Sequence, residues 1–219
     1  MIEPAFDLER LAASRHICIV GPPGSGKTTL ARRLAGILDR QIVQMDDLPY
    51  AFWLRHGRNP STAELQAELS KVLSRDRLIT DGFYSSTIEQ RFTTADVIVY
   101  YDLPAYICLL SAFKRGLKNL FVPTSAHEQT RDNLRARLEY CFKPRLYWRI
   151  ARFRRAYHAD LQRRFAALAG QKQIIILQSR QQSNRLIEAL EALRAGSYSR
   201  SQQDDSPGSV LVDRASHQL

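Results

Sequence analysis

The sequence predicts an α/β fold in which helices cover both faces of a parallel sheet. Five short apolar runs, the expected strands, alternate with segments of helical periodicity, and such alternation indicates βαβ units. Most of these runs end in a polar residue or a glycine. Ligands of such sheets bind beyond the carboxyl ends of the strands, so these residues are expected to meet there. The expected strands span residues 16–21, 41–45, 77–81, 96–102 and 173–178.

A glycine-rich loop ends the first expected strand and fits the pattern G-x-x-x-x-G-K-[ST]. Glycines allow backbone N–H groups to approach phosphate oxygens, and the helix that follows turns its positive end toward the same anion. In this pattern Lys27 reaches the β- and γ-phosphates, and the Thr28 hydroxyl ligates Mg²⁺. The loop therefore predicts that the chain binds ATP and Mg²⁺. The residues expected to bind the nucleotide here are Gly21, Pro22, Pro23, Gly24, Ser25, Gly26, Lys27, Thr28 and Thr29.

Helices are expected in the connections between strands. After the loop, apolar residues including Leu30 and Leu34 repeat at helical spacing. Ser61 and Glu64 have the spacing of a capping box, which predicts a helix that continues through Leu73.

Carboxylates follow the second and third expected strands. Asp81 is the candidate that completes the Mg²⁺ site with Thr28, the alternative being a cap on the next helix. Asp46, with Asp47 beside it as a weaker candidate, is expected to hold an acceptor hydroxyl or accept its proton. The alternative for both is an N-cap, which suits aspartate.

Four cationic side chains are candidates for anion contacts. Arg91 offers a planar guanidinium to a substrate anion. Lys114 and Lys118 are four residues apart, so they share a helix face, where like charges repel unless an anion lies between them. We therefore expect Arg115 or Lys118 to act catalytically by stabilising the transferred phosphate. The five histidines are scattered and predict no metal site.

A long, basic excursion separates the fourth and fifth expected strands. Residues 103–170 are expected to be mostly helical and divided at Pro144. Within them, residues 114–164 contain fourteen Lys or Arg and four Asp or Glu, an excess that equals the chain's net charge of +10. We interpret residues 112–165 as a helical lid over a phosphorylated ligand; a solvated helix face and nucleic-acid contact are the alternatives. The aromatic residues Tyr140, Phe142, Tyr147 and Trp148 are interpreted as core rather than as a stacking platform.

Composition predicts one nucleotide-binding domain over residues 1–195, with a disordered tail over residues 196–219, where Ser, Gln, Asp, Pro and Gly dominate. The three cysteines are widely spaced and are expected to be reduced thiols. No apolar run approaches the ~18 residues of a membrane span, and the acidic N-terminus does not resemble a secretory signal. A cytoplasmic location without a membrane partner is expected, and the sequence gives no indication of oligomeric state.

Taken in order, these segments resemble the adenylate-kinase-like P-loop kinases and, among them, the DNA topology modulation proteins of the FlaR type. The resemblance rests on residues 19–31, 45–48, 80–85, 95–98, 101–104 and 176–180, which include Asp-Gly-x-Tyr at 81–84 and Asp-Leu-Pro at 102–104. It implies a three-layer P-loop NTPase fold with a five-stranded sheet in the order 2-3-1-4-5 and a lid after strand four. It also implies that Ser179 and Arg180 lie near the adenine. The acceptor side is then expected to include Asp46, Asp81, Tyr84, Arg91 and Arg131.

One departure from that family concerns the lid. Relatives carry an arginine-rich segment soon after strand four, which residues 116–124 lack. Either the lid arginines lie at Arg131 and Arg135, or the lid is catalytically weakened.

The leading hypothesis is an ATP- and Mg²⁺-dependent phosphotransferase that acts on a small-molecule or nucleotide acceptor. An ATP-binding protein that contacts nucleic acid through its basic helices, and a slow ATPase that gates a protein partner, are the alternatives.

Overall fold

Five parallel strands form the centre of the molecule. The computed structural model describes residues 6–121 and 143–204. The strands lie side by side in the order β2-β3-β1-β4-β5, so the implied order is confirmed. Each observed strand falls within its expected range: β1 (His16–Val20), β2 (Gln41–Gln44), β3 (Leu78–Asp81), β4 (Val97–Tyr101) and β5 (Gln173–Leu177).

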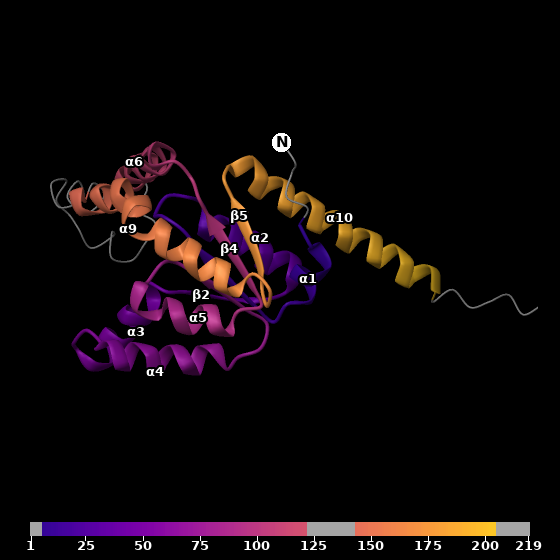
Figure 1. Ribbon diagram of the computed structural model, residues 1–219, viewed down its shortest axis with the longest axis horizontal. Helices are drawn as coiled ribbons and strands as arrows, with labels where there is room; N and C mark the ends of the chain where they lie inside the picture. Colours follow the sequence, from indigo (N-terminus) through magenta and orange to yellow (C-terminus); the bar gives the residue numbers. More distant parts are fainter. Residues whose placement is uncertain (1–5, 122–142, 205–219) are drawn as a thin grey trace, which may run out of the picture.

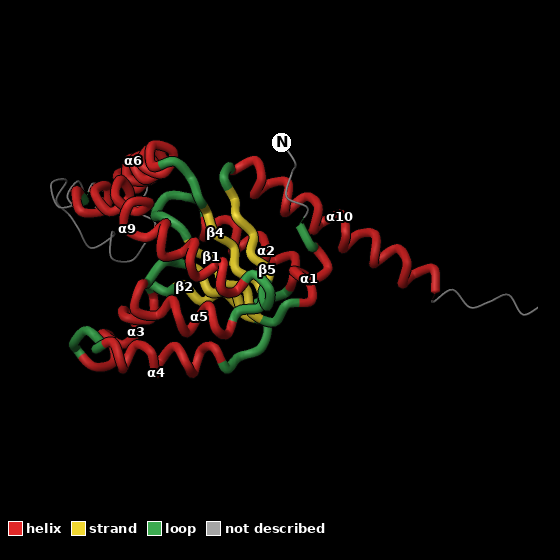
Figure 2. Tube along the Cα trace, viewed as in Figure 1, coloured by secondary structure: helices red, strands yellow, loops and turns green. Residues whose placement is uncertain are grey.

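Helices cover both faces of this sheet, as Figures 1 and 2 show. On β1, Ile17 and Ile19 pack into one apolar cluster with α1, α2, α6, α10 and the start of α9, whereas Cys18 and Val20 pack into another with α5 and the rest of α9. The alternation of side chains along a strand explains this division, and the predicted three layers are confirmed. The helices are α1 (Leu8–Ala13), α2 (Lys27–Leu38), α3 (Asp47–His56), α4 (Thr62–Leu73), α5 (Ile88–Thr94), α6 (Ala105–Phe121), α9 (Pro144–Leu168) and α10 (Arg180–Asp204).

The register of the strands brings their carboxyl ends to one edge. Ile19 of β1 is level with Asp81 of β3, and Val20 is level with Tyr100 of β4. The glycine-rich loop, Asp81 and Asp102 therefore leave the sheet beside one another. Since β1, β3 and β4 are buried on both faces, this edge rests on a well-packed base.

Local sequence signals set several helix ends. The Ser61 hydroxyl accepts a hydrogen bond from the Glu64 N–H and the Glu64 carboxylate accepts one from the Ser61 N–H, so the capping box is confirmed. Pro144 is at the first turn of α9, where its missing N–H is tolerated. In contrast, α10 continues past Gly196, where we expected the domain to give way to a tail, to Asp204. One helical glycine costs only about 1 kcal/mol relative to alanine, which does not suffice to end a helix.

Among the described residues, no helix combines the length and the apolar character that crossing a membrane requires.

Candidate active site

A cavity of about 1170 Å³ opens at the carboxyl edge of the sheet. Its lining comes from the glycine-rich loop, from the turns after β2 and β3, and from α6, α9 and the first turn of α10. This is the position at which ligands bind in open parallel sheets. The geometry therefore gathers segments from most of the chain around one site.

The glycine-rich loop is shaped for an anion. Gly24 and Gly26 have φ values of +82° and +104°, a left-handed backbone that favours glycine. A Cβ on Gly24 would also lie only 2.4 Å from the carbonyl oxygen of Cys108. Gly26 is the N-cap of α2, which has neither a side-chain cap nor an acidic residue in its first turn. The positive end of this helix is thus left to a bound phosphate.

Lys27 lies at the base of the cavity beside this loop. Its Nζ donates a hydrogen bond to the Pro22 carbonyl at 2.8 Å. Burial lowers the pKa of the amine to about 8, although the Asp81 and Asp46 carboxylates oppose this effect. The ammonium form is the one that neutralises phosphate charge, and it prevails below that pH.

Thr28 and Asp81 form the most suggestive contact in the cavity. The Thr28 hydroxyl donates to Asp81 Oδ2 at 2.5 Å, and the other carboxylate oxygen, Oδ1, is buried with no hydrogen-bond partner among the described residues. Burial raises the pKa of Asp81, because the loss of water outweighs the opposing effects of the Thr28 hydrogen bond and of the nearby cations Lys27 and Arg91. A hydroxyl and a carboxylate with an unsatisfied oxygen are ligands that Mg²⁺ prefers. These residues therefore fit the metal that the sequence predicts.

Asp46 and Tyr84 line another part of the cavity. Asp46 is at the N-cap position of α3, but its side chain makes no capping hydrogen bond. The capping alternative is therefore not realised, and the exposed carboxylate is available to a ligand. Burial, and next the charge of Asp46, raises the pKa of the Tyr84 phenol, which shows that the two groups are close.

Of the three basic candidates on α6, which are Lys114, Arg115 and Lys118, Arg115 lines the cavity. It is close enough to Lys27 that its charge contributes to the lowered pKa of that amine. Lys114 and Lys118 are exposed on α6 outside the lining. Arg131 and Arg135 lie outside the described residues, as does the central part of the expected lid, residues 122–142.

The expectation that Arg91 contacts a substrate is not supported by its position. Its side chain is 1% exposed, and the guanidinium donates to the carbonyls of Gly82 (2.8 Å), Thr80 (3.1 Å) and Ile19 (3.4 Å) and to the Thr80 hydroxyl (3.2 Å). These partners belong to the ends of β1 and β3. Arg91 therefore supports the turn that carries Asp81 and is not part of the cavity lining.

We expect Arg91→Met to lower the free energy of unfolding by about 1–3 kcal/mol, because buried carbonyls lose their donor. Urea denaturation measures this change. Arg32→Met, at an exposed position of α2, is the matched control. Equal stability of the two variants would contradict the structural role.

The first turn of α10 separates the two residues expected near the adenine. Arg180 lines the cavity and donates to the Ser111 hydroxyl of α6. Ser179 is outside the lining; its hydroxyl accepts from the Gln182 N–H at 3.1 Å and so caps the helix. Of these two residues, Arg180 is therefore the one placed to contact a nucleotide.

The start of α9 supplies residues that the sequence analysis did not assign to the site. Trp148, expected in the core, is 60% exposed and lines the cavity, as do Arg149 and Arg152. The Arg152 guanidinium lies over the Trp148 ring at 4.7 Å. Tyr147 is half-buried, while Tyr140 and Phe142 lie outside the described residues. The dense positive charge of this segment is the sequence signal for an anion site. Residue spacing alone does not show which side chains of α9 face the cavity.

Comparisons with known proteins agree with this site. A family model for the NACHT domain matches residues 15–94, which contain the glycine-rich loop. A shikimate kinase from Corynebacterium diphtheriae is 31% identical over 99 residues, 41% of this chain and 57% of that protein. The chain is thus similar to P-loop proteins, a kinase among them. It spans just over half the length of that curated relative.

Solved structures of low identity resemble the fold. The shikimate kinase of Bacteroides thetaiotaomicron is 14% identical, with 83% of this chain and 98% of that chain covered and a TM-score of 0.44. A shikimate kinase from Acinetobacter baumannii in complex with shikimate is 18% identical, with 91% and 99% covered and a TM-score of 0.41. A gluconokinase from Sinorhizobium meliloti is 13% identical, with 87% and 97% covered and a TM-score of 0.42.

Proposed function

We propose that this protein is an ATP- and Mg²⁺-dependent phosphotransferase that moves the γ-phosphate to a hydroxyl of a small acceptor. The observation that carries the proposal is the convergence of Lys27, the Thr28–Asp81 pair and Asp46 on one cavity. Phosphoryl transfer requires positioning and charge neutralisation, which these groups supply. The similarity to a shikimate kinase supports a small-molecule acceptor.

Each residue has a distinct role in this proposal. Lys27 neutralises charge on the transferred group, and Arg115 lies close enough to assist it. Thr28 and Asp81 would hold Mg²⁺, which when bound neutralises phosphate charge and orients the phosphate oxygens. Asp46 orients the acceptor hydroxyl and accepts its proton.

A screen for acceptor-dependent ADP formation tests the proposal. The panel should contain nucleosides, nucleoside monophosphates and small hydroxylated metabolites, with shikimate and gluconate among them. We expect at least one compound to raise ADP formation well above hydrolysis in its absence. ADP formation that no acceptor stimulates would instead support a slow ATPase that gates a protein partner.

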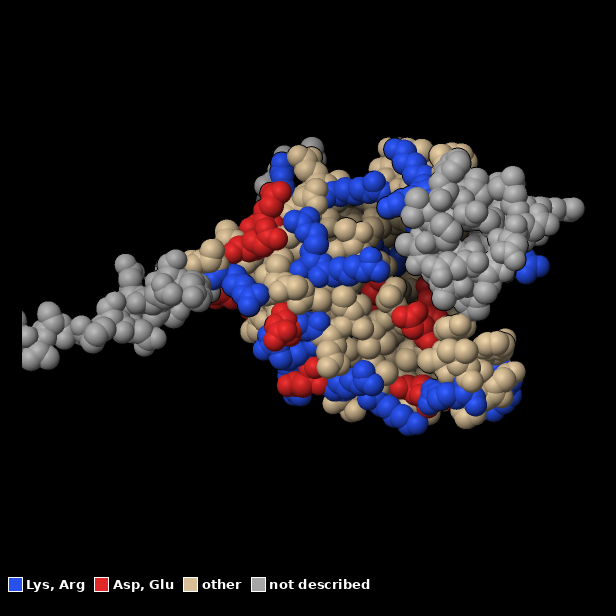
Figure 3. Space-filling model, turned by 180° about the vertical axis from the view of Figure 1, so that it is seen from behind, with Lys and Arg blue, Asp and Glu red and all other residues tan. Residues whose placement is uncertain are grey.

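A second candidate, nucleic-acid contact, is favoured by the exposed arginines at the start of α9: Arg145, Arg149, Arg152 and Arg155. Lys and Arg side chains also lie beside uncharged residues on the face of the molecule that Figure 3 shows. Such binding weakens steeply with salt. Duplex and single-stranded probes that fail to bind at low salt would exclude this candidate.

We also propose that the protein is related to the FlaR-type proteins and that it acts in the cytoplasm.

A further inference from the structure

A buried carboxylate joins α9 to the sheet beside the cavity. Asp102 follows β4 directly, and its side chain is 7% exposed. Two groups of α9 approach it: Arg154 Nη2 at 3.6 Å from Oδ2 and His158 Nδ1 at 3.6 Å from Oδ1. The hydroxyl of Tyr100 lies 3.4 Å from the same imidazole nitrogen. We call Asp102, Arg154 and His158 the α9 clasp.

These contacts differ from ordinary surface ion pairs. A carboxylate removed from water is unfavourable unless partners compensate it. Burial, and next the Asp102 charge, raises the pKa of Tyr100, so the phenol stays neutral beside this carboxylate. Among the described residues, the side chains that pair with the Asp102 carboxylate, Arg154 and His158, both come from α9.

The clasp also lies next to the phosphate loop. Tyr101, which precedes Asp102, packs so closely on Gly21 that a Cβ there would approach the Tyr101 carbonyl oxygen to 2.9 Å. The end of β4 is thus fixed against the first residue of the loop. Because α9 contacts Asp102, its position is fixed relative to the loop that would bind the phosphates.

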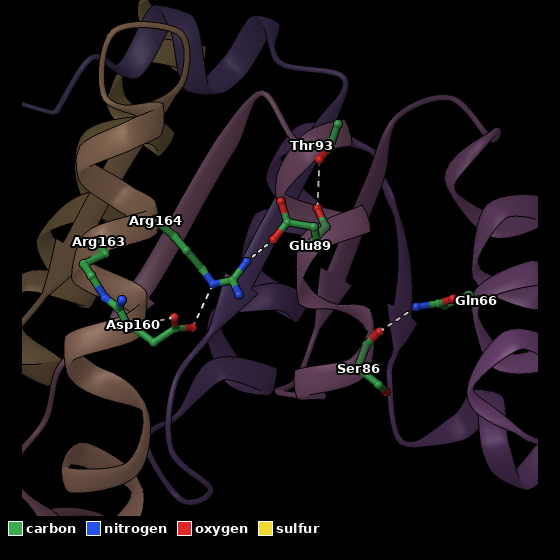
Figure 4. A network of polar contacts seen from close by, with 7 residues as sticks. All are labelled: Gln66, Ser86, Glu89, Thr93, Asp160, Arg163 and Arg164. Atoms are coloured by element: carbon green, nitrogen blue, oxygen red, sulfur yellow. Dashed lines mark hydrogen bonds and ion pairs between the residues drawn. The ribbon is translucent and has the colours of Figure 1, made fainter.

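On the other side of α9, Trp148, Arg149 and Arg152 line the cavity. Arg152 and Arg154 are two residues apart on a helix and so point in different directions, one to the cavity and one to the clasp. The far half of α9 is fastened separately, since Arg164 pairs with Glu89 of α5 and with Asp160 of its own helix (Figure 4). The clasp is therefore a polar link, within the described residues, between the sheet and the half of α9 that lines the cavity.

We propose that the α9 clasp positions the cationic, cavity-lining half of α9 against the phosphate loop. Asp102, Arg154 and His158 are positioning residues that act through Trp148, Arg149 and Arg152. This inference rests on the proposed function, in which the cavity that this half of α9 lines holds ATP and the acceptor.

Fluorescence of Trp148 tests the proposal without an acceptor or turnover. The chain has two tryptophans, and Trp53→Phe leaves Trp148 as the reporter. In that background we expect Asp102→Asn, Arg154→Gln and His158→Gln each to raise acrylamide quenching of Trp148, by no more than about twofold because the ring is already 60% exposed and the ion pairs that are lost are partly exposed.

Asp160→Asn, on the same helix but paired within it, is the matched control and should leave quenching unchanged. Arg154 is exposed, so Arg154→Gln should fold even where Asp102→Asn does not. Unchanged quenching in folded Arg154→Gln and His158→Gln would overturn the clasp. Calorimetric titration with ATP and Mg²⁺ separates the two proposals: loss of ATP binding in the parent contradicts the proposed function, whereas the Trp148 readout judges the clasp alone.

Discussion

Lys27→Ala is expected to lower acceptor-dependent turnover by about 10²–10³-fold or more, the loss typical of removing one preorganised charge or donor from a transition state. The Nζ of Lys27 lies within the glycine-rich loop, on the Pro22 carbonyl, and no other lysine lines the cavity in the described residues. Arg115, which lies on α6 and outside the loop, can assist this charge but does not occupy its position on the loop. Steady-state ADP formation at saturating ATP measures the loss, and Lys71→Ala, at an exposed position on α4, is the control.

The pH profile provides a second test of Lys27. Burial lowers the pKa of its amine to about 8, so in the ligand-free protein the ammonium form is present below that pH and is lost as the pH rises through it. Because kcat/KM reports groups of the free enzyme, it should fall on the alkaline side with a midpoint near that value. Full activity in Lys27→Ala would refute the assignment of the loop as the phosphate site.

The parts of the structure that sequence predicted well depend on local pattern. Apolar runs marked the five strands because a strand covered on both faces needs no polar residue. The Lys27–Thr28 pair was identifiable because the loop geometry requires glycines at fixed spacing. Asp81 was identified because it follows a buried strand, and the topology then brings it to Thr28 at 2.5 Å.

The parts that sequence did not predict depend on which way a side chain points. The guanidinium of Arg91 could bind an anion, yet α5 directs it inward to backbone carbonyls. Trp148 sits at helical spacing with aromatic neighbours, yet it faces the cavity. In both cases a rotation of the helix about its axis decides between core and site. That rotation is set by packing against the sheet, which a single sequence records only indirectly.

Asp81→Asn is expected to lower Mg²⁺-dependent turnover by about 100-fold, at the upper end of the losses seen when a group that supports a metal site is removed. The amide has nearly the shape of the carboxylate and can still accept from the Thr28 hydroxyl. It lacks the negative charge that would hold Mg²⁺ at the buried oxygen, Oδ1, which has no partner within the described residues. Titration of activity with Mg²⁺ at fixed ATP should show a higher requirement for the metal.

The stability of the same variant should move in the opposite direction. Burial raises the pKa of Asp81 above its ordinary value, so the folded, ligand-free protein favours the protonated form and loses stability as the pH rises through the folded pKa. At neutral pH, Asn removes this unfavourable charge, and thermal denaturation without ligand should show stability equal to or above that of the parent. The additional stabilisation by ATP and Mg²⁺ should shrink, because it reports ligand affinity. Asp76→Asn, an exposed partner of Arg15, should leave both the metal requirement and the ligand-induced stabilisation unchanged. A variant at Asp81 that lost stability without ligand while keeping its response to Mg²⁺ would show that this carboxylate holds the fold together instead of holding a metal.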